Sequence, residues 1–536
     1  MAVTYAKEYN GMYCGTMSED RIKYILNVRG QQEVEGFKQM LFDFPPEMVY
    51  ESLTSGESIR NRIIREQGDF SKYYGTLRGY QTVGAAFMYL SPRSIIGDGV
   101  GAGKTVEISA LINYLKGKGE MKRFLIAVET SALGQTQCEL IRFTGLNIIA
   151  LPSEAAKMRK VINNTDWNTV DGVVIKHSAL RSDVLSTWLS LYIDNTTNMS
   201  TMFDTFFLDE SSVIKNRGTK MFTYTENICN IVRRVHFMNA TAFETCIMDI
   251  YNQMDMMNGN LLPKKWRIEK EYCTYGQKKY WTKDEDGKAK LNFARDMKGY
   301  KNQEKFKESL KLVYFGRSKK EIGKELPHTY KVYEIEPTTE QCMAINKGHR
   351  YSEVLNCPSN IENIGFEFNR KMVPKLDRLI QLVETEFKQD KVMIYCFHIN
   401  AQKVIKEELE KIGRNPIILN GECVDEERNN AISAFNNGDK DVIITNIQKS
   451  LNLYGGDVCI FYSMVGNPAK MEQVRGRIDR SVDDKLKTFV LLLYKYTDEY
   501  KFFTDKARQR AEDSRELTID AKTAVDFFID AMELDN

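Results

Sequence analysis

The residues with the clearest chemistry lie in a glycine-rich loop at residues 97–105, which reads GDGVGAGKT. Around Gly99, Gly101 and Gly103, backbone N–H groups can curl around phosphates, and the amino end of the helix expected next adds a favourable potential. Lys104 is placed to reach the β- and γ-phosphates, and Thr105 to ligate Mg²⁺. The loop predicts ATP or GTP binding with Mg²⁺. The alternative is a glycine-rich strand-to-helix turn, and Asp98 stands where the strict pattern has glycine.

An Asp-Glu pair supplies the carboxylates that a nucleotide-hydrolysing site needs. Asp209 and Glu210 follow the apolar run Phe206-Phe207-Leu208, about a hundred residues after the loop. An Asp at the carboxyl end of a neighbouring strand can hold Mg²⁺, and the adjacent Glu can orient and deprotonate the attacking water. On its own such a pair is usually a solvated strand end. Its combination with the loop favours hydrolysis.

A second group of cations follows near the carboxyl end of the chain, where residues 473–480 read QVRGRIDR. Arg477 and Arg480 are three residues apart, so on a helix they share a face. Two guanidinium groups pointing across a cleft could neutralise charge on a transferring phosphoryl group. The alternative is an exposed basic helix that makes surface ion pairs.

The elements that must position these residues form two separate α/β stretches. Short β-branched runs alternate with helical-period segments, which predicts parallel strands with crossover helices. One helix stripe contains Ile108, Leu111, Ile112 and Leu115. The strands expected in the first lobe are 94–96, 124–129, 172–176, 206–209 and 235–239, and those in the second lobe are 392–397, 416–419, 441–445, 458–462 and 489–494.

Five regions follow from this pattern: an N-terminal accessory region at 1–75, an ATP-binding lobe at 76–261, a basic insertion or linker at 262–370, a second lobe at 371–499 and an acidic helical tail at 500–536. The tail places Ala524, Val525, Phe528, Ala531 and Met532 on one stripe, with acids opposite. We expect this helix to pack on a lobe. Docking to a protein partner is the alternative.

The region between the lobes contains the strongest local positive charge. The chain as a whole carries only +2, but residues 264–311 hold fifteen Lys/Arg against eight Asp/Glu. Cations there alternate with large aromatic residues, a pattern suited to phosphate contacts combined with base stacking. The alternative is a local aromatic core beneath a solvated lysine face. The candidate nucleic-acid contacts are Lys264, Lys265, Trp266, Arg267, Lys278, Lys279 and Trp281.

Composition places the chain among ordinary intracellular globular proteins. Hydrophobic residues make up 42% of its 536 residues, and the ten cysteines show neither C-x-x-C pairs nor zinc spacing. We therefore expect reduced thiols. The amino terminus lacks a signal-peptide pattern, and no apolar run is long enough to span a bilayer. We expect a soluble, cytoplasmic protein without a membrane partner, and a viral protein inside a host cell also fits.

Taken together, these motifs resemble the SNF2-like branch of helicase superfamily two. Residues 77–81 (LRGYQ) resemble the motif whose Gln, here Gln81, contacts adenine, and residues 98–105 (DGVGAGKT) are similar to D-E-M-G-L-G-K-T, in which the Asp is a family trait. Residues 208–216 (LDESSVIKN) resemble L-D-E-A-H-x-I-K-N. Residues 239–242 (NATA) resemble the coupling motif N-G-T-P, which assigns Asn239 and Thr241 to coupling.

The resemblance continues to about residue 495. Residues 315–321 (FGRSKKE) and Leu326-Pro327 resemble R-R-x-K-x-x-V and L-P, residues 419–421 (LNG) resemble L-D-G, and residues 473–480 match Q-x-x-G-R-x-x-R, with Gln473 as a coupling residue. Two departures stand out. Ser211-Ser212 replaces Ala-His, and residues 445–453 (TNIQKSLNL) lack the glycines expected before Asn-Leu. These departures leave the Asp-Glu pair intact.

The resemblance implies two RecA-like lobes that hydrolyse ATP between them to move along or remodel duplex or branched DNA. The alternatives are a strand-separating or branch-migrating helicase, a motor acting on RNA and, from another class, a nucleotide-gated DNA- or protein-binding module with negligible turnover. Glu210, Arg477 and Arg480 argue against the last, because a pure switch could dispense with them.

Overall fold

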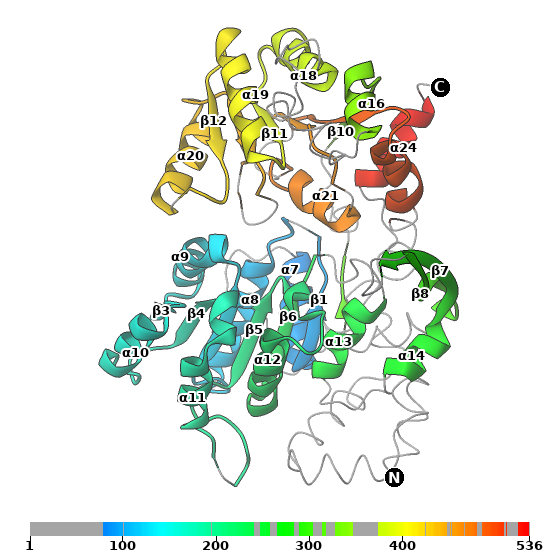
Figure 1. Cartoon of the computed structure of the whole chain (residues 1–536). Coiled ribbons are helices and arrows are strands. Elements are labelled where there is room, and N and C mark those ends of the chain that lie inside the picture. Colours follow the sequence, from blue (N-terminus) through cyan, green and yellow to red (C-terminus); the bar gives the residue numbers. More distant parts are fainter. Residues whose placement is uncertain are drawn as a thin grey trace. The chain divides into compact units, whose positions relative to one another are not determined.

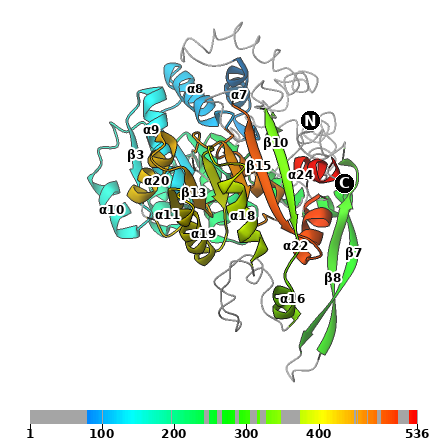
Figure 2. The same ribbon diagram turned by 90° about the horizontal axis from the view of Figure 1, so that it is seen from above.

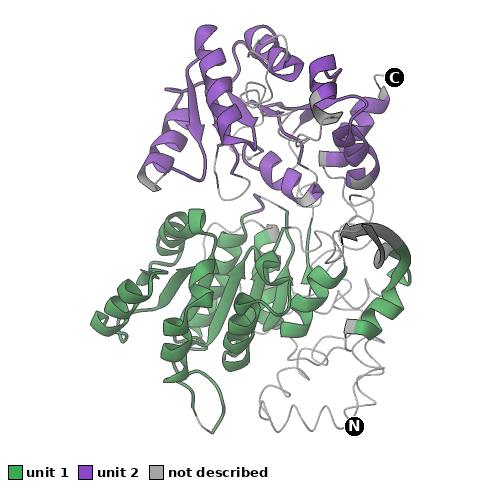
Figure 3. Cartoon of the chain, viewed as in Figure 1, with its two compact units in different colours: residues 1–99, 103–317, 513–519 green, residues 100–102, 318–512, 520–536 purple. Residues whose placement is uncertain are grey.

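The computed structural model consists of two compact units, coloured separately in Figure 3. Unit 1 comprises residues 1–99, 103–317 and 513–519, and unit 2 comprises residues 100–102, 318–512 and 520–536. The predicted accessory region 1–75 lies outside the described residues, as do Thr241, Lys264 and Arg480. The structure describes residues 79–99, 101–194, 196–240, 247–257, 265–283, 289–303, 314–317, 327–346, 373–423, 425–447, 451, 453–465, 467–479, 485–508, 511 and 524–534.

Unit 1 is built on a parallel sheet of seven strands in the order β3-β4-β2-β5-β6-β1-β9. Figure 1 shows the helices packed around this sheet. The strands are β1 (Arg93–Ile96), β2 (Phe124–Val128), β3 (Ile148–Leu151), β4 (Gly172–Lys176), β5 (Thr205–Asp209), β6 (Arg234–Met238) and β9 (Tyr314–Phe315).

Helices cover both faces of this sheet, because alternate residues of each central strand belong to different apolar cores. In β2, Phe124 and Ile126 pack into one core, and Leu125 and Ala127 into the other. The first core is covered by α7 (Gly79–Leu90), α8 (Lys104–Gly117) and α9 (Leu133–Thr144). The second is covered by α10 (Ala155–Asn164), α11 (Asp183–Ser190), α12 (Lys220–Ile231) and α13 (Ile247–Met257).

The sequence pattern located most of these elements. All five strands predicted for the first lobe are present, with ends within one residue of the expected ones, and the stripe of α8 is fully buried. Two strands were missed. β3 and β9 are short strands of four and two residues, and each pairs with a single neighbour at an edge of the sheet. Strands of that length have too few residues to show a hydrophobic period.

A long antiparallel ribbon follows the first sheet in the sequence. It consists of β7 (Cys273–Lys283) and β8 (Ala289–Tyr300), which form a two-stranded sheet of their own (Figure 2). Its base is anchored in unit 1, because Ile268 and Tyr272 of α14 (Lys265–Tyr272) and Cys273 are buried in the second core. The basic inter-lobe region therefore contains a defined ribbon where the sequence showed no clear alternation.

Unit 2 has a parallel sheet of six strands in the order β10-β15-β14-β11-β13-β12. The strands are β10 (His328–Ile335), β11 (Val392–Tyr395), β12 (Pro416–Leu419), β13 (Val442–Thr445), β14 (Val458–Phe461) and β15 (Lys487–Tyr494). One face is covered by α18 (Pro374–Glu384) and α19 (Ile399–Lys411), and the other by α20 (Asp425–Asn437), α21 (Pro468–Arg475) and α24 (Ala524–Leu534). The prediction of two parallel α/β lobes is confirmed.

The second sheet begins earlier in the chain than the pattern suggested. β10 pairs with β15 along its whole length, although it falls in the stretch 262–370 that the pattern assigned to an insertion or linker. The strand carries charged residues within an apolar run, which obscured its period. At this sheet edge Lys331 pairs with Glu386, while Glu334 pairs with Lys495 at 2.7 Å. Edge strands tolerate such charges because one side of the strand is not covered by a neighbour.

The carboxyl-terminal helix α24 packs on unit 2, as expected of a helix with one apolar stripe. Val525 and Phe528 are fully buried. The Phe527 ring stacks on Tyr330 of β10 at 4.8 Å, and the Phe528 ring meets Phe461 of β14 edge-on at 5.7 Å. The apolar stripe is therefore covered by the chain itself, so the alternative of partner docking through this stripe has no support here.

Two expectations from composition can be compared with the structure. Seven cysteines fall among the described residues, and all are free thiols. Within the same part of the chain, none of the helices has the length and apolar character needed to cross a bilayer.

Candidate nucleotide site

The loop and the Asp-Glu pair both lie at the carboxyl ends of strands in the first sheet. Ile96 of β1 is in register with Met238 of β6, and Met238 is in register with Asp209 of β5. Neighbouring strands lie about 4.8 Å apart, so the backbones of Ile96 and Asp209 are about 10 Å apart across β6. The loop starts at Gly97, and the Asp-Glu pair ends β5. A nucleoside triphosphate with its metal fits this spacing.

Two glycines give the loop a left-handed backbone at two positions. Gly101 and Gly103 adopt φ values of 84° and 92°, a region that residues with a β-carbon rarely enter. Gly103 also caps the amino end of α8. A β-carbon at Gly103 would lie 2.6 Å from Nε2 of Gln81, so the Gln81 amide sits directly against the loop. The sequence placed both residues in the nucleotide site, and the structure brings them together.

Lys104 is the first residue of α8 and points back into the loop. Its Nζ donates to the carbonyl oxygens of Asp98 at 2.8 Å and Gly99 at 3.3 Å. The side chain is only partly buried, so a phosphate could replace these carbonyl acceptors. An ammonium group attracts an anionic oxygen more strongly than a neutral carbonyl. In the structure the Lys104 ammonium group therefore lies against the loop, held by two backbone carbonyl oxygens.

The side chain and the backbone of Asp98 make different contacts. Its side chain is fully buried and accepts from Arg317: Nη2 approaches Oδ2 at 2.5 Å, and the backbone N of Arg317 approaches Oδ1 at 2.9 Å. Nη2 of Arg317 also donates to Glu107 of α8 at 3.0 Å. The Asp98 carboxylate is therefore paired with Arg317, and the predicted place of Asp98 in the nucleotide-binding loop involves its backbone, whose carbonyl oxygen accepts from Lys104.

The charged groups in this cluster shift one another's pKa values. Burial, and then the negative charge of Asp98, hold the pKa of Glu107 well above its usual range, while Arg317 and Lys104 oppose the shift. Burial lowers the pKa of Arg317, but Asp98 and Glu107 outweigh it and raise that pKa above its ordinary value. Neither Glu107 nor a role for Arg317 was predicted from the sequence. No sequence pattern links Arg317 to Glu107, which lies 210 residues earlier, or to Asp98, which lies 219 residues earlier.

The Asp-Glu pair ends β5 in a constrained turn. Glu210 has φ 49° and ψ 54°, a left-handed conformation that costs a glutamate about 1–3 kcal/mol. The carbonyl oxygen of Asp209 lies 2.8 Å from Nε2 of His177, and Ser211 donates to the buried Oε1 of Gln253 on α13. These contacts fix the turn on both sides. His177 and Gln253 were not predicted as part of the site.

Asn239, a predicted coupling residue, lies directly after β6, between the loop and the Asp-Glu pair. It is almost fully buried, and its backbone N donates to the carbonyl oxygen of Ile96 at 2.9 Å. Ile96 is the last residue before the loop. A movement at the end of β6 would therefore reach the start of the loop through one backbone hydrogen bond.

The Mg²⁺ ligands that the sequence predicts are Thr105 and Asp209. Thr105 and Asp209 are each partly exposed at this edge of the sheet. No group of three or more His, Cys, Asp or Glu side chains able to hold a metal occurs within the described ranges. Mg²⁺ in phosphate sites takes one or two protein ligands, with phosphate and water oxygens completing its shell. The pair Thr105 and Asp209 suits this mode of binding.

In unit 2, the arginine motif follows β14 on and just after α21. Arg477 is only 4% exposed; its Nε donates to the carbonyl oxygen of Gln473 at 2.6 Å and its Nη1 to that of Leu451 at 3.1 Å. Gln473 is fully buried. In this structure Arg477 thus tethers the segment at Leu451, instead of standing free as a solvent-facing cation.

Arg475, which the sequence analysis passed over, forms a buried ionic network. It contacts Glu472 at 2.8 Å and Asp479 at 3.4 Å, and its Nη1 donates to the hydroxyl of Tyr330 at 3.1 Å. Burial would lower the pKa of Arg475, but the carboxylates of Glu472 and Asp479 and the Tyr330 hydroxyl raise it instead. The Glu-x-x-Arg-x-x-x-Asp spacing was the available sequence signal.

Of the predicted nucleic-acid residues, two have described side chains. Trp266 is 58% exposed, and the guanidinium of Arg267 lies 5.6 Å from its ring centroid. Trp266 is therefore not part of a local core. Lys265 lies at the start of α14, and Lys278, Lys279 and Trp281 lie on β7.

Comparisons with known proteins find similarity over part of the chain. Residues 374–482 match the family described as helicase conserved C-terminal domain. The ATP-dependent helicase fft1 of Schizosaccharomyces pombe is 28% identical over 165 residues. That match covers 28% of this chain and 16% of the yeast protein.

Two solved structures from Sulfolobus solfataricus are also similar to the chain. The SWI2/SNF2 ATPase core in complex with dsDNA is 19% identical, with a TM-score of 0.39, and the match covers 82% of this chain and 97% of that one. The SWI2/SNF2 ATPase core domain is 18% identical, with a TM-score of 0.37, over 81% and 89% of the two chains.

Proposed function

We propose that this chain, whose residues 374–482 match the helicase conserved C-terminal domain family, is an ATP-driven motor that moves along or remodels duplex or branched DNA. One observation carries the proposal. A phosphate-binding loop and an Asp-Glu pair lie at the same sheet edge in unit 1, about 10 Å apart across β6. Hydrolysis of ATP by the purified chain, with and without DNA, tests it.

Each residue at this edge then has a defined task. Lys104 exchanges its carbonyl acceptors for phosphate oxygens, and Gln81 contacts the base. Thr105 and Asp209 would hold Mg²⁺, which supplies charge neutralisation on the phosphates. Glu210 orients the attacking water and accepts its proton. The turn at Glu210 is fixed on both sides by the hydrogen bonds of Asp209 O to His177 and of Ser211 to Gln253.

The arginines of the second unit would neutralise charge on the transferring phosphoryl group. Arg480 is assigned this task by its place in the motif. Arg477 could take part only after exchanging its hydrogen bonds to Gln473 and Leu451 for phosphate oxygens. Such an exchange would couple phosphate contact to movement of the segment at Leu451.

Nucleic-acid binding is assigned to α14 and the ribbon. Register pairs Lys279 with Phe293 and Trp281 with Leu291, so these four residues occupy adjacent paired positions, and opposed residues of an antiparallel pair share a face. Cations next to aromatic residues suit phosphate contact combined with base stacking. The ribbon belongs to neither large sheet, so its strands are not needed to complete one.

Replacing Lys278 and Lys279 together with alanine should weaken nucleic-acid binding. Removing one lysine that binds a phosphate lowers the slope of log affinity against log salt by about 1, so removing two such lysines should lower it by about 2. The measurement is a binding titration at several salt concentrations. The matched control is Lys157→Ala with Lys160→Ala on α10, which removes the same charge elsewhere on unit 1. Equal effects of the two double variants would argue against the assignment.

A further inference from the structure

Arg317 is the last residue of unit 1 before the chain enters unit 2, yet it lies beneath the phosphate loop. It is only 8% exposed. Its guanidinium contacts Asp98 of the loop and Glu107 of α8, at 2.5 and 3.0 Å, and lies 4.4 Å from the Phe315 ring centroid. One side chain therefore joins both arms of the loop, the strand side and the helix side.

The backbone around Arg317 is bonded to the same loop. Strand β9 pairs in parallel with β1, and two further hydrogen bonds extend this pairing: Gly97 N donates to Phe315 O at 2.6 Å and Gly99 N to Arg317 O at 3.1 Å. A β-carbon at Gly97 would lie 1.9 Å from the Tyr314 hydroxyl oxygen. Residues 314–317 therefore pack directly on the first three residues of the loop.

Asp98 connects this segment to the phosphate-binding lysine. Its carboxylate accepts from Arg317, and its carbonyl oxygen accepts from Lys104 Nζ at 2.8 Å. A shift of Arg317 would move Asp98 and, with it, one of the two carbonyls that hold the lysine. Arg317 is therefore linked to Lys104 through two contacts, one from Arg317 to the Asp98 carboxylate and one from Lys104 to the Asp98 carbonyl oxygen.

The cluster contains more negative than positive charge once Arg317 is removed. The carboxylates of Asp98 and Glu107 are both fully buried. Within the described part of the chain, Oε2 of Glu107 has no hydrogen-bond partner. A β-carbon at Gly84 of α7 would come within 2.6 Å of the Glu107 carboxyl carbon, which leaves this carboxylate little room to move away. Without Arg317 both carboxyl groups lose their hydrogen bonds to the guanidinium; Glu107, whose pKa is already raised by burial, takes up a proton, and Asp98 stays as a buried carboxylate without its paired arginine.

We propose that Arg317 is a positioning residue of the nucleotide site: it holds the phosphate loop in its binding shape through Asp98 and Glu107. Phosphate binding then depends on the segment that leads into unit 2. The proposal rests on the proposed function, because it assumes that the loop binds the phosphates of ATP.

The decisive variant is Arg317→Met, which keeps a long side chain but removes the charge and the donors. We expect the KM for ATP to rise about tenfold and kcat/KM to fall about a hundredfold, since misplacing a binding group by about 1 Å can cost that much. Arg317→Lys keeps the charge without the two-pronged donor geometry and should give an intermediate loss.

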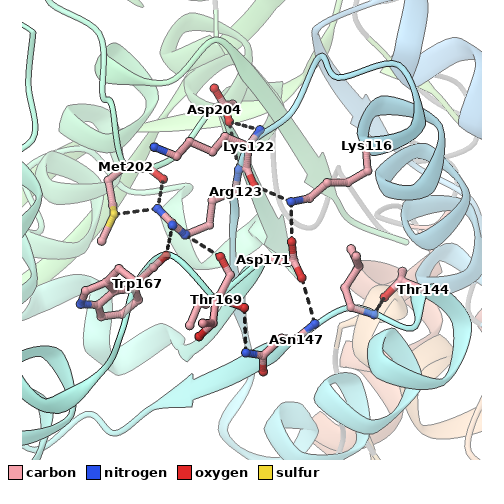
Figure 4. Close-up of polar contacts among 12 residues, drawn as sticks. Lys116, Lys122, Arg123, Thr144, Asn147, Trp167, Thr169, Asp171, Met202 and Asp204 are labelled. Carbon is pink, nitrogen blue, oxygen red and sulfur yellow. Dashed lines mark hydrogen bonds and ion pairs between the residues drawn. The ribbon is translucent and has the colours of Figure 1, made fainter.

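The matched control is Arg123→Met. Arg123 directly precedes β2, so it lies at the amino ends of the strands, whereas the loop lies at their carboxyl ends. Arg123 is 3% exposed and donates to the carbonyl oxygens of Val170 and Met202 at 2.8 and 3.0 Å, next to the start of β2 (Figure 4). Like Arg317, which is 8% exposed, Arg123 is a buried arginine, so its replacement removes a similar side chain far from the loop. We expect a lower melting temperature with unchanged KM and kcat.

A second variant separates positioning from general destabilisation. Adding Asp98→Asn to Arg317→Met removes the buried carboxylate left without its arginine, while the backbone carbonyl that holds Lys104 stays in place. The double variant should recover at least part of the missing kcat/KM, although it carries more substitutions. Melting temperature is measured for every variant, so that a loss of folded protein is not mistaken for a loss of positioning.

Two results would overturn the proposal. The first is an Arg317→Met variant whose KM and kcat match those of Arg123→Met, and the second is a double variant no more active than Arg317→Met. Failure of the proposed function looks different, because the unaltered chain would then neither bind nor hydrolyse ATP. Binding of ATP by the unaltered chain, with a tenfold weaker KM in Arg317→Met alone, supports both.

Discussion

Replacing Lys104 with alanine should reduce ATP hydrolysis by about 10²–10³-fold, the loss seen when one preorganised stabiliser of developing charge is removed. The structure gives the reason. Lys104 Nζ is held over the loop by two carbonyl oxygens and is the cation nearest to the bound phosphates in the proposed site. Steady-state release of phosphate is the measurement.

The control for Lys104 is Lys118→Ala, at the other end of the same helix. Lys118 caps the carboxyl end of α8 and is exposed. Its removal changes the net charge equally, so hydrolysis should be retained. Melting temperature is measured for both variants, because a hydrogen bond from a charged group contributes about 1.5–3 kcal/mol to the free energy of unfolding. Unchanged hydrolysis in Lys104→Ala would show that the loop is not a phosphate site.

Replacing Glu210 with glutamine should lower kcat by about 10²–10⁴-fold while leaving ATP affinity nearly unchanged. Glutamine has almost the same shape but cannot accept the proton of the attacking water. Because the left-handed backbone at residue 210 is retained, the turn should keep its geometry. The measurements are the ATP dissociation constant and the single-turnover rate.

Asp209→Asn provides the comparison for this second prediction. Asp209 is the proposed Mg²⁺ ligand, so its loss should weaken binding of the Mg²⁺–ATP complex as well as slow turnover. Glu210→Gln should slow turnover only. If both variants showed equally weakened affinity, the division of roles between the two carboxylates would be incorrect.

The parts of the fold that the sequence predicted are those with a strong local signal. Residues 124–128 and 392–395 are β-branched or apolar throughout, and both are buried central strands. The loop and the Asp-Glu pair were found because spacing and residue type alone define their chemistry. β3 and β10 were missed. The first has four residues, and the second carries Lys331 and Glu334 within an apolar run.

The parts of the site that the sequence could not give depend on contacts between distant positions. Asp98 was predicted as part of the nucleotide-binding loop, but the sequence did not show that its carboxylate is paired with Arg317, 219 residues away. Spacing predicts that Arg477 and Arg480 share a helix face, but α21 ends at Arg475, so Arg477 lies beyond the helix. Spacing could not show that the carbonyl oxygen of Leu451 accepts from Arg477. Such pairings are set by how strands are ordered in the sheet, which local patterns do not contain.

The most direct test of the central claim is steady-state ATP hydrolysis by the purified chain. It is measured without nucleic acid and with single-stranded DNA, duplex DNA, forked DNA or RNA, at low and moderate salt, with Lys104→Ala as the background. We predict strong stimulation by duplex or forked DNA. Stimulation by single strands or RNA alone would contradict the duplex motor in favour of a strand-separating or RNA-acting helicase, and no turnover under any condition would leave a nucleotide-gated binding protein.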